Sequence, residues 1–405
     1  MFFGNNITPN KQECCGCSAC EQICTYRALK IIPDNEGFLY PVLDPQKCTD
    51  CNLCEKVCPM LHGDDVKSEP SDAYAAVNKD INQLLGSSSG GIFSVIATHI
   101  LELGGIVYGA SFDDTMQLQH IGISQIDDLE QLRGSKYLQS NNKNVYSEIK
   151  ESLKKGKWIY YTGTGCQVAG LKCFLRKKYP TLLTSDLICH GTPSQIIFDA
   201  MIAEVEKKYN GKIIKFKFRD KKINGWSCSS SSSCYIKNKN KIKYLGFDPI
   251  MKAYFNAFIA GDMNREACYN CPFTTVNRAG DITLADYWGI SKYHTIENKQ
   301  NGISAILINT KQGEQIIHSL ENQIKLVPTK IDWIADENHN LTSKTRRPAK
   351  RNTFYTLLQK SPSKLLQSYK KDVFMSYIRF NIKKICRKND RTYSFILKIK
   401  DKIKK

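Results

Sequence analysis

The N-terminal cysteines constrain the fold of this chain more than any other feature. A run with the spacing C-x-x-C-x-x-C-x-x-x-C occurs twice, and each cysteine of the second run lies 34 residues after its counterpart in the first. The two runs are Cys14, Cys17, Cys20 and Cys24, then Cys48, Cys51, Cys54 and Cys58. A run of this spacing wraps three thiolates around one face of a 4Fe–4S cube and sends the fourth to a neighbouring cube. The repeat therefore predicts a domain built around two 4Fe–4S clusters.

The spacing is typical of bacterial two-cluster ferredoxins, in which the fourth cysteine of each run crosses to the other cluster. The predicted ligand sets are Cys14, Cys17, Cys20 and Cys58 for the first cluster, and Cys48, Cys51, Cys54 and Cys24 for the second. Structural zinc, the alternative, favours two separated cysteine pairs over two runs of four. Cys15 is expected to be a packed neighbour rather than a ligand. Thr25 stands where a proline often follows the fourth cysteine.

The remaining composition favours a reduced, intracellular protein of two or three domains. The chain has 405 residues and 17 cysteines, nine of them within the first 58 residues. The N-terminus has no apolar core of signal-peptide length, and no apolar run approaches the roughly 20 residues that span a bilayer. We expect a cytoplasmic protein, where thiols stay reduced and clustered cysteines indicate metal or redox chemistry.

Positive charge is concentrated at the C-terminal end. Residues 341–405 carry 20 Lys and Arg against 3 Asp and Glu, whereas the preceding 340 residues carry 38 against 36. The body is therefore nearly neutral, which argues against a nucleic-acid-binding protein as a whole.

Beyond a polar linker at 63–72, the chain alternates strand-like and helix-like segments. Residues 157–163 and 182–188 predict strands, and 166–179 and 193–209 predict the helices that follow them. Residues 303–309 predict a further strand, 311–321 a helix, and 212–220 with 234–246 a strand and a hairpin. We therefore predict a multi-domain α/β (α+β) protein. It consists of a ferredoxin-type domain (1–62), a mixed-sheet body in two parts (73–165 and 166–340), and a basic helical tail (341–405).

Four cysteines of the body occupy positions where such folds bind ligands. Cys166 and Cys189 each follow a predicted strand, and ligands of α/β sheets lie beyond the carboxyl ends of the strands. Cys268 and Cys271 form a C-x-x-C pair. Any one of the four taken singly is better explained as a buried, inert thiol. Together they could form a third four-thiolate site, and a 4Fe–4S cluster suits a chain that already holds two.

The small residues at 86–91, GSSSGG, precede an amphipathic helix. Such a loop offers free backbone N–H groups to a phosphate. A flexible turn with a serine cap explains the same composition, because the spacing matches neither a dinucleotide fingerprint nor a P-loop.

Taken together, these segments resemble the beta-subunit family of coenzyme F(420) hydrogenases and dehydrogenases, including variants with a fused N-terminal ferredoxin. The resemblance runs from about residue 10 to 310. It is carried by the two cysteine runs, GSSSGG (86–91), RGSKYLQS (133–140), GTGCQVAGLK (163–172), DLICHGTPS (186–194) and CYNCPFTTVNRAGDITLADYWG (268–289). One departure is Thr164, where the family often has proline.

The resemblance implies that the body binds FAD and a further cluster. It makes Ser87, Ser88, Ser89, Gly90, Gly91 and Lys136 flavin-site candidates, and it strengthens Cys166, Cys189, Cys268 and Cys271 as ligands of a third cluster. We accordingly expect a flavin-dependent iron–sulfur oxidoreductase, with His190 and Asp286 as candidate proton donors. The alternative is an electron-transfer subunit without its own substrate, docked on a partner enzyme. The electron donor or acceptor is expected to be a redox protein or a small molecule. The resemblance does not imply that this chain uses the deazaflavin itself.

The tail contains a second amphipathic pattern. Apolar residues recur at helical spacing between residues 366 and 385, surrounded by lysine and arginine. Such a helix either packs its apolar side on the body or lies on an anionic membrane, which would place the protein on the inner membrane face. No nucleic acid is expected, because no recognised binding motif is present.

Overall fold

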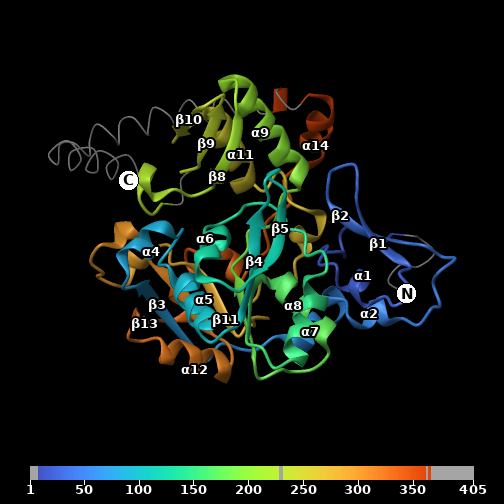
Figure 1. Cartoon of the computed structure of the whole chain (residues 1–405), viewed down its shortest axis with the longest axis horizontal. Helices are drawn as coiled ribbons and strands as arrows, with labels where there is room; N and C mark the ends of the chain where they lie inside the picture. The colour runs from blue at the N-terminus through green and yellow to red at the C-terminus, as the bar shows by residue number, and fades with distance from the viewer. Residues whose placement is uncertain (1–7, 228–230, 362–363, 366–405) are drawn as a thin grey trace.

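The computed structural model describes residues 8–227, 231–361 and 364–365, and it places the two cysteine runs in a small domain at one end of the molecule (Figure 1). That domain contains the antiparallel pair β1 (Leu29–Pro33) and β2 (Leu39–Leu43), and the short helices α1 (Ala19–Ile23), α2 (Leu53–Lys56), α3 (Pro59–His62) and η1 (Gly63–Val66). The sequence repeat is also a structural repeat. Ser18 and Asn52, 34 residues apart, precede α1 and α2 with matching left-handed φ angles of 67° and 57°.

An eight-stranded mixed sheet forms the centre of the body, in the order β13-β3-β12-β11-β7-β6-β4-β5. The strands are β3 (Asp72–Asn78), β4 (Ile106–Phe112), β5 (Leu118–Ile123), β6 (Ile159–Thr164), β7 (Leu182–Leu187), β11 (Ile282–Asp286), β12 (Ser304–Ile308) and β13 (Ile324–Pro328). The four central strands β11, β7, β6 and β4 run parallel, and the pairs outside them are antiparallel. The predicted mixed-sheet α/β class is therefore confirmed.

Helices cover both faces of this sheet because its central strands are apolar on both sides. Along β6, Tyr160 packs on one side with α5 (Ile92–Glu102), α6 (Leu129–Leu132) and α12 (Lys311–Ser319). Its neighbours Ile159 and Tyr161 point to the opposite side, where α7 (Val145–Lys154) and α8 (Gly165–Leu175) lie. The helix α13 (Ile331–Ala335) covers the β3–β12 end of the second face. The alternation of neighbouring side chains along a strand thus produces a three-layer body.

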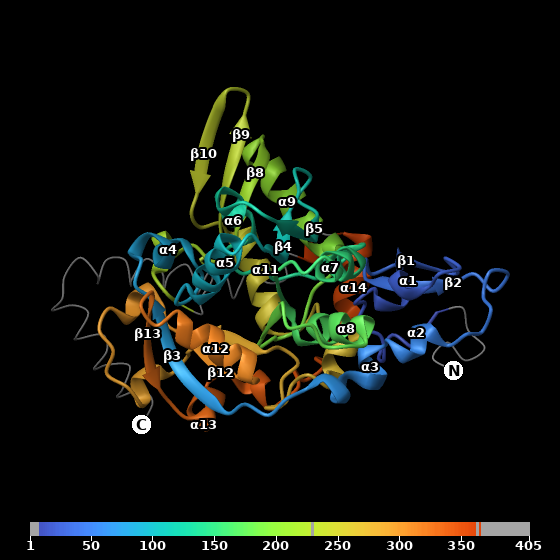
Figure 2. The ribbon, with the colours of Figure 1, turned by 60° about the horizontal axis from the view of Figure 1, so that its bottom comes forward.

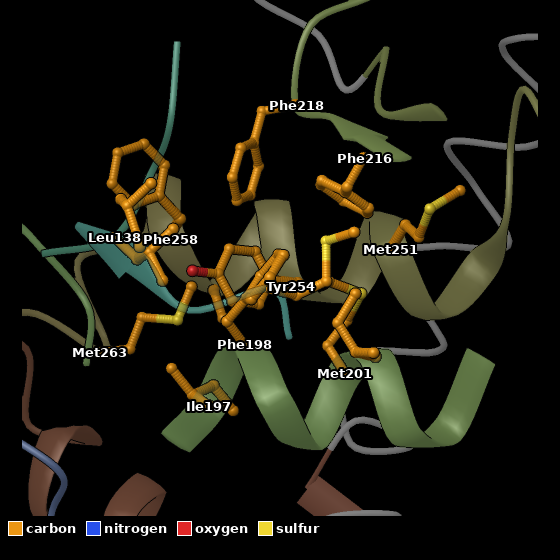
Figure 3. Packing of buried hydrophobic residues seen from close by; sticks show 14 of the residues in the cluster. Leu138, Ile197, Phe198, Met201, Phe216, Phe218, Met251, Tyr254, Phe258 and Met263 are labelled. Atoms are coloured by element: carbon orange, nitrogen blue, oxygen red, sulfur yellow. The ribbon is translucent and has the colours of Figure 1, made fainter. Parts of the chain in front are cut away.

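A second lobe is inserted after β7 and projects from the body (Figure 2). It contains α9 (Gln195–Tyr209), β8 (Lys212–Lys217), α10 (Lys221–Asn224), β9 (Ser233–Asn238), β10 (Lys241–Leu245) and α11 (Pro249–Ile259). Its core is rich in aromatic and methionine side chains from α9, α11 and β8 (Figure 3). Phe198 packs edge-to-face on Phe216 and on Tyr254. Phe38 of the N-terminal domain and Tyr355 of α14 (Arg351–Lys360) belong to the same cluster, so the lobe and the N-terminal domain share a core.

The segment 63–72 between the N-terminal domain and the body is itself held in place. The helix η1 packs against α8, and Ser68 and Arg278 exchange two backbone hydrogen bonds of 2.8 Å. Lys67 donates to the Pro272 carbonyl at 2.7 Å. Within the described part of the chain, no helix has the length and apolarity needed to cross a membrane. Most of the basic amphipathic segment, from residue 366 onward, lies outside the described residues.

Candidate functional site

Thiols from both cysteine runs surround one small cavity in the N-terminal domain. The cavity is lined by Cys14, Cys17, Cys20 and Cys58, with Ile31, Pro41 and Pro59 among its apolar walls. Gly16 has a φ of 69°, and a Cβ at this position would lie 2.7 Å from both the Arg265 guanidinium and the Gln139 amide. The chain can turn around the cavity in this way only because residue 16 carries no side chain. The structure thus brings together the first predicted ligand set, including the thiol that comes from the second run.

The electrostatics of this group suit a cationic iron–sulfur core. Burial raises the pKa of the Cys20 thiol well above its ordinary value, and the charges of Cys14, Cys58 and Cys54 raise it further. Burial, with a contribution from Cys14, raises the pKa of Cys58 to about 12. Four thiolates at such close quarters repel one another, and bound iron supplies the positive charge that keeps ligating thiols deprotonated. The donor set therefore fits a 4Fe–4S cluster.

The second predicted set lies beside the first and nearer the surface. Burial raises the pKa of Cys54, and the charge of Cys48 contributes to the rise. Cys51 is exposed. Cys24 follows α1 and accepts a hydrogen bond from the Ala28 backbone N–H at 3.3 Å. The proximity of Cys20 to Cys54 places the two sets side by side, with the second set at the outer end.

The crossover of the fourth cysteines predicts a specific result for Cys58→Ser. The variant should lose about four irons, and its reduced EPR spectrum should match that of Cys14→Ser, because both changes remove a ligand of the first cluster. Cys234→Ser replaces a buried thiol of β9, and it should leave iron and spectrum unchanged. A Cys58→Ser spectrum that matched Cys48→Ser instead would contradict the crossover.

The body brings its own four thiols together at the edge of the large sheet. Cys166 begins α8 directly after β6, and Cys189 follows β7, the parallel neighbour of β6. Cys268 lies in the short helix η3 (Glu266–Asn270), and Cys271 ends it. Burial raises the pKa of Cys189 well above its usual value, and Cys268, Cys166 and Cys271 each raise it further. The charges of Cys166 and Cys268 likewise add to the effect of burial on Cys271, whose pKa rises to about 12. These mutual effects show that the four thiols share one buried neighbourhood.

Polar groups point at the sulfurs of this second neighbourhood. The Thr164 hydroxyl lies 3.1 Å from Cys166 Sγ, and the Gly191 backbone N–H donates to Cys189 Sγ at 3.4 Å. The Thr192 hydroxyl lies 3.8 Å from Cys268 Sγ. Hydrogen bonds to ligating sulfurs are one of the ways in which a protein sets the reduction potential of a cluster. Thr164, the departure from the family pattern, thus places a hydroxyl beside Cys166 Sγ, and the same hydroxyl donates to Gln167 Oε1 at 3.1 Å.

Cys15 lies between the thiols of the body and those of the N-terminal domain. Its thiol lines the cavity of the first set. The same thiol is within hydrogen-bonding reach of Cys166 and Cys17. The Gln139 amide donates to the Cys15 carbonyl at 3.0 Å, and the buried Asn142 amide donates to the Cys17 carbonyl at 3.1 Å. The body therefore holds this turn of the N-terminal domain directly against its own cysteines.

The small-residue loop is rigid and joins the other flavin-candidate segment. Ser88 Oγ accepts a hydrogen bond from the Ser135 backbone N–H at 2.8 Å, and Ser89 Oγ donates to the Ile303 carbonyl at 2.9 Å. Ser87 Oγ donates to the Gln83 carbonyl at 2.7 Å. A Cβ at Gly90 would lie 2.3 Å from the Ala76 carbonyl oxygen, so only glycine fits there. Gly91 then caps the start of α5 with a φ of 81°. The Ser87 and Ser89 hydroxyls thus donate within the fold, whereas Ser88 Oγ accepts a hydrogen bond, so the loop can offer a ligand its backbone groups and the Ser88 O–H.

Lys136 is partly buried and follows Ser135, whose backbone N–H donates to Ser88 of this loop. Its ammonium group donates to the carbonyls of Leu132 and Arg133, both at 2.9 Å, at the end of α6. Burial lowers the pKa of Lys136 to about 7. The position is compatible with an anionic ligand, although Lys136 already has backbone partners.

Two cations missed from the sequence reach the same region from the inserted lobe. Lys221 donates to the carbonyls of Leu84 and Ser89, both at 2.6 Å, and burial lowers its pKa to about 7. Arg219 is buried and forms an ion pair with Asp286. Its Nη2 has no hydrogen-bond partner among the described residues. The sequence signal that could have located them is the basic stretch 215–222. Only in the folded protein does the end of this stretch lie beside the loop 86–91.

Aromatic rings complete this corner of the molecule. The Arg219 guanidinium lies 5.2 Å from the centre of the Trp288 ring, and Trp288 stacks on Trp226 with ring centres 4.8 Å apart. The Trp226 indole N–H donates to Asp286 at 2.6 Å. Flat aromatic surfaces, cations and a rigid glycine-containing loop form a set of groups that fits a flavin and its phosphates.

The two candidate proton donors have different surroundings. His190 directs its ring nitrogens toward the Asn340 side-chain oxygen and the Ile259 carbonyl, each at 3.1 Å. Asp286 forms an ion pair with Arg219 and accepts a hydrogen bond from the Trp226 indole N–H. Their roles as acids stay predictions, and slower product formation with normal flavin reduction in His190→Ala would support the first.

In the described residues, no three His, Cys, Asp or Glu side chains are grouped so as to bind a single metal ion. The three ligand sets therefore rest on spacing and on shared neighbourhoods.

Two parts of the chain match known protein families. Residues 13–61 match the model of the 4Fe-4S dicluster domain. Residues 156–332 match the model for the C terminus of the coenzyme F420 hydrogenase/dehydrogenase beta subunit. One similar solved structure is a xenon-derivatised F420-reducing (NiFe) hydrogenase complex from Methanosarcina barkeri. It has 16% identity to this chain, covers 75% of this chain and 92% of its own, and gives a TM-score of 0.42, too low to support an inference. The search of curated proteins gave no match.

Proposed function

We propose that this chain is an iron–sulfur flavoprotein oxidoreductase, because residues 13–61 match the 4Fe-4S dicluster domain and residues 156–332 match the C terminus of the coenzyme F420 hydrogenase/dehydrogenase beta subunit. In this proposal the body binds FAD near residues 86–91 and a third 4Fe–4S cluster through Cys166, Cys189, Cys268 and Cys271. Electron-transfer chemistry follows from the dicluster domain itself, and the flavin and the third cluster are the proposed additions.

The observation that carries the proposal is the succession of thiols across the domain boundary. The four body thiols share one neighbourhood, Cys166 meets Cys15, and Cys15 lines the cavity of the first N-terminal set. The second set continues the series toward the exposed Cys51. A flavin exchanges electrons in pairs or singly, whereas each cluster carries one, so the combination connects two-electron and one-electron chemistry.

The residues of the chain have separable tasks in this scheme. The loop 86–91 and Lys221 would hold the phosphates of the flavin, since backbone N–H groups and a buried ammonium favour anions. Trp288 and Trp226 offer an apolar surface that limits water. The body cysteines would hold the third cluster, and the hydrogen bonds from Gln139 and Asn142 to the Cys15 and Cys17 carbonyls would keep the first ligand set next to it.

The exposed Cys51 of the second set favours a second candidate function, in which the chain is an electron-transfer subunit docked on a partner enzyme. Cys51 reaches the surface at the end of the series farthest from the body thiols, where a redox protein could approach. A chain that exchanges electrons with a partner protein but has no substrate of its own would support this alternative.

Anaerobic purification with iron, sulfide and flavin counted per chain tests the proposal. The full scheme expects about twelve irons, four for each cluster, and one FAD. About eight irons per chain would contradict the third cluster. Iron without flavin would contradict the flavin-dependent catalysis.

A further inference from the structure

Arg265 occupies the junction between the N-terminal domain and the body. It lies just before η3, and only 1% of its surface is exposed. Its Nε donates to the Cys14 carbonyl at 2.6 Å, and its Nη2 donates to the Leu39 carbonyl at 2.8 Å. Its Nη1 donates to the Gln139 side chain at 3.0 Å. The guanidinium therefore binds both sides of the domain boundary.

The same guanidinium also touches a sulfur. Arg265 Nη2 lies 3.6 Å from Cys14 Sγ, within hydrogen-bonding distance for sulfur. The ring of Tyr40 packs on the guanidinium with its centre 4.0 Å away. On the body side, the charge of Arg265 acts on Cys166 and Cys268. One cation thus lies between a thiol of the first N-terminal set and two thiols of the body.

Arg265 differs from the other fully buried arginines in its charge partner. Arg278 lies 3.2 Å from the Asp186 carboxylate, and Arg351 lies 2.6 Å from that of Glu36. No carboxylate lies within ion-pair distance of Arg265 among the described residues. A buried guanidinium without a counter-charge is costly, so buried charges are normally paired. The ionisable groups that act on Arg265 are Cys14 first, then the Tyr40 phenol, and then the thiols of Cys15 and Cys268.

We propose that Arg265 is the counter-charge shared by the first N-terminal cluster and the third cluster, and that it raises the reduction potentials of both. The inference rests on the proposed function, because it takes these thiols as cluster ligands. A cluster becomes more negative when it gains one electron, so a nearby cation and an N–H···S hydrogen bond stabilise the reduced form. The electron moves from one cluster to the other while Arg265 keeps its protons, and no bond forms or breaks.

Potentiometric EPR titration of the cluster-loaded full chain tests the inference. In Arg265→Gln, the first and third clusters should be reduced at more negative potentials than in the wild type. The second cluster should keep its potential, and the iron content should be unchanged. Arg347→Gln is the matched control, because Arg347 is partly exposed and pairs with Glu266 of the same short helix. Unshifted potentials in an iron-replete Arg265→Gln chain would overturn the inference.

If Arg265→Gln does not fold, Arg265→Lys provides a second test of the inference. Lysine keeps the positive charge but lacks the planar fork of donors that reaches two carbonyls and Cys14 Sγ together. The first cluster, which loses a hydrogen bond, should shift to a more negative potential, whereas the third, which senses only charge, should move less. Equal potentials in Arg265→Lys and the wild type at the first cluster would count against the inference. If the wild type contains about eight irons, the third cluster of the proposed function is rejected instead. The effect of Arg265 would then be measured on the reduction potential of the first cluster alone.

Discussion

Replacing both Cys268 and Cys271 with serine is expected to remove about four irons per chain and leave the two N-terminal clusters spectroscopically normal. The two cysteines lie in and at the end of η3, beside Cys166 and Cys189 and outside the cavity of the first set. Without them, two thiols remain, too few to hold a cube. Flavin reduced in this variant should no longer pass electrons to the N-terminal clusters. Iron analysis, EPR and stopped-flow absorbance measure the three effects.

The control for this pair is Cys234→Ser, a change of a buried thiol in the inserted lobe, which should keep all the iron. An unchanged iron count in the double variant would show that Cys268 and Cys271 are packing residues and not cluster ligands. Loss of all iron would show that the N-terminal domain depends on the body site for folding.

The sheet was predictable because its signals are local. Residue patterns only a few positions long indicate the strand at Ile159–Thr164, the helix after it and the strand at Leu182–Leu187. Parallel pairing of these two strands then brings Cys166 and Cys189 to the same sheet edge. Cys268 and Cys271 lie in the same neighbourhood, and their role as cluster ligands stays a prediction.

The surroundings of the thiols were not predictable, because they depend on contacts between distant segments. Arg265 and Cys14 are 251 residues apart in the chain, and nothing in the sequence near Arg265 indicates a sulfur partner. Cys15 was expected only to pack, and the structure places it against Cys166 through the docking of the two domains. Local patterns specify which residues carry chemistry, whereas docking decides which of them meet.

The proposed flavin site likewise combines a local sequence pattern with contacts between distant segments. The loop 86–91 was recognisable from its small residues, but Lys221 reaches the Ser89 carbonyl from the inserted lobe, 132 residues along the chain. Lys136 was a candidate by resemblance, and only the structure shows that its ammonium group already binds the end of α6.

Lys221→Met is expected to weaken flavin binding by about tenfold to a hundredfold, the effect of losing a hydrogen bond to a charged group worth roughly 1.5–3 kcal/mol. Methionine keeps the apolar stem in its place and removes the ammonium group that lies between the Leu84 and Ser89 carbonyls. Lys215→Met is the control, because Lys215 is exposed on β8 and should not affect the flavin. Fluorescence titration of flavin into the flavin-depleted chain measures both variants.

The pH dependence of flavin binding distinguishes an electrostatic role of Lys221 from a purely structural one. Burial lowers the pKa of Lys221 to about 7, so in the empty site the ammonium group loses its proton as pH rises through that value. An anionic phosphate favours the protonated form, and binding above pH 7 must therefore include the uptake of a proton. Flavin affinity of the wild type should fall as pH rises from about 6 to 8, and part of that fall should disappear in Lys221→Met, with Lys136 accounting for the rest. Flavin binding that is equally tight in the wild type and Lys221→Met would place the flavin phosphates away from Lys221.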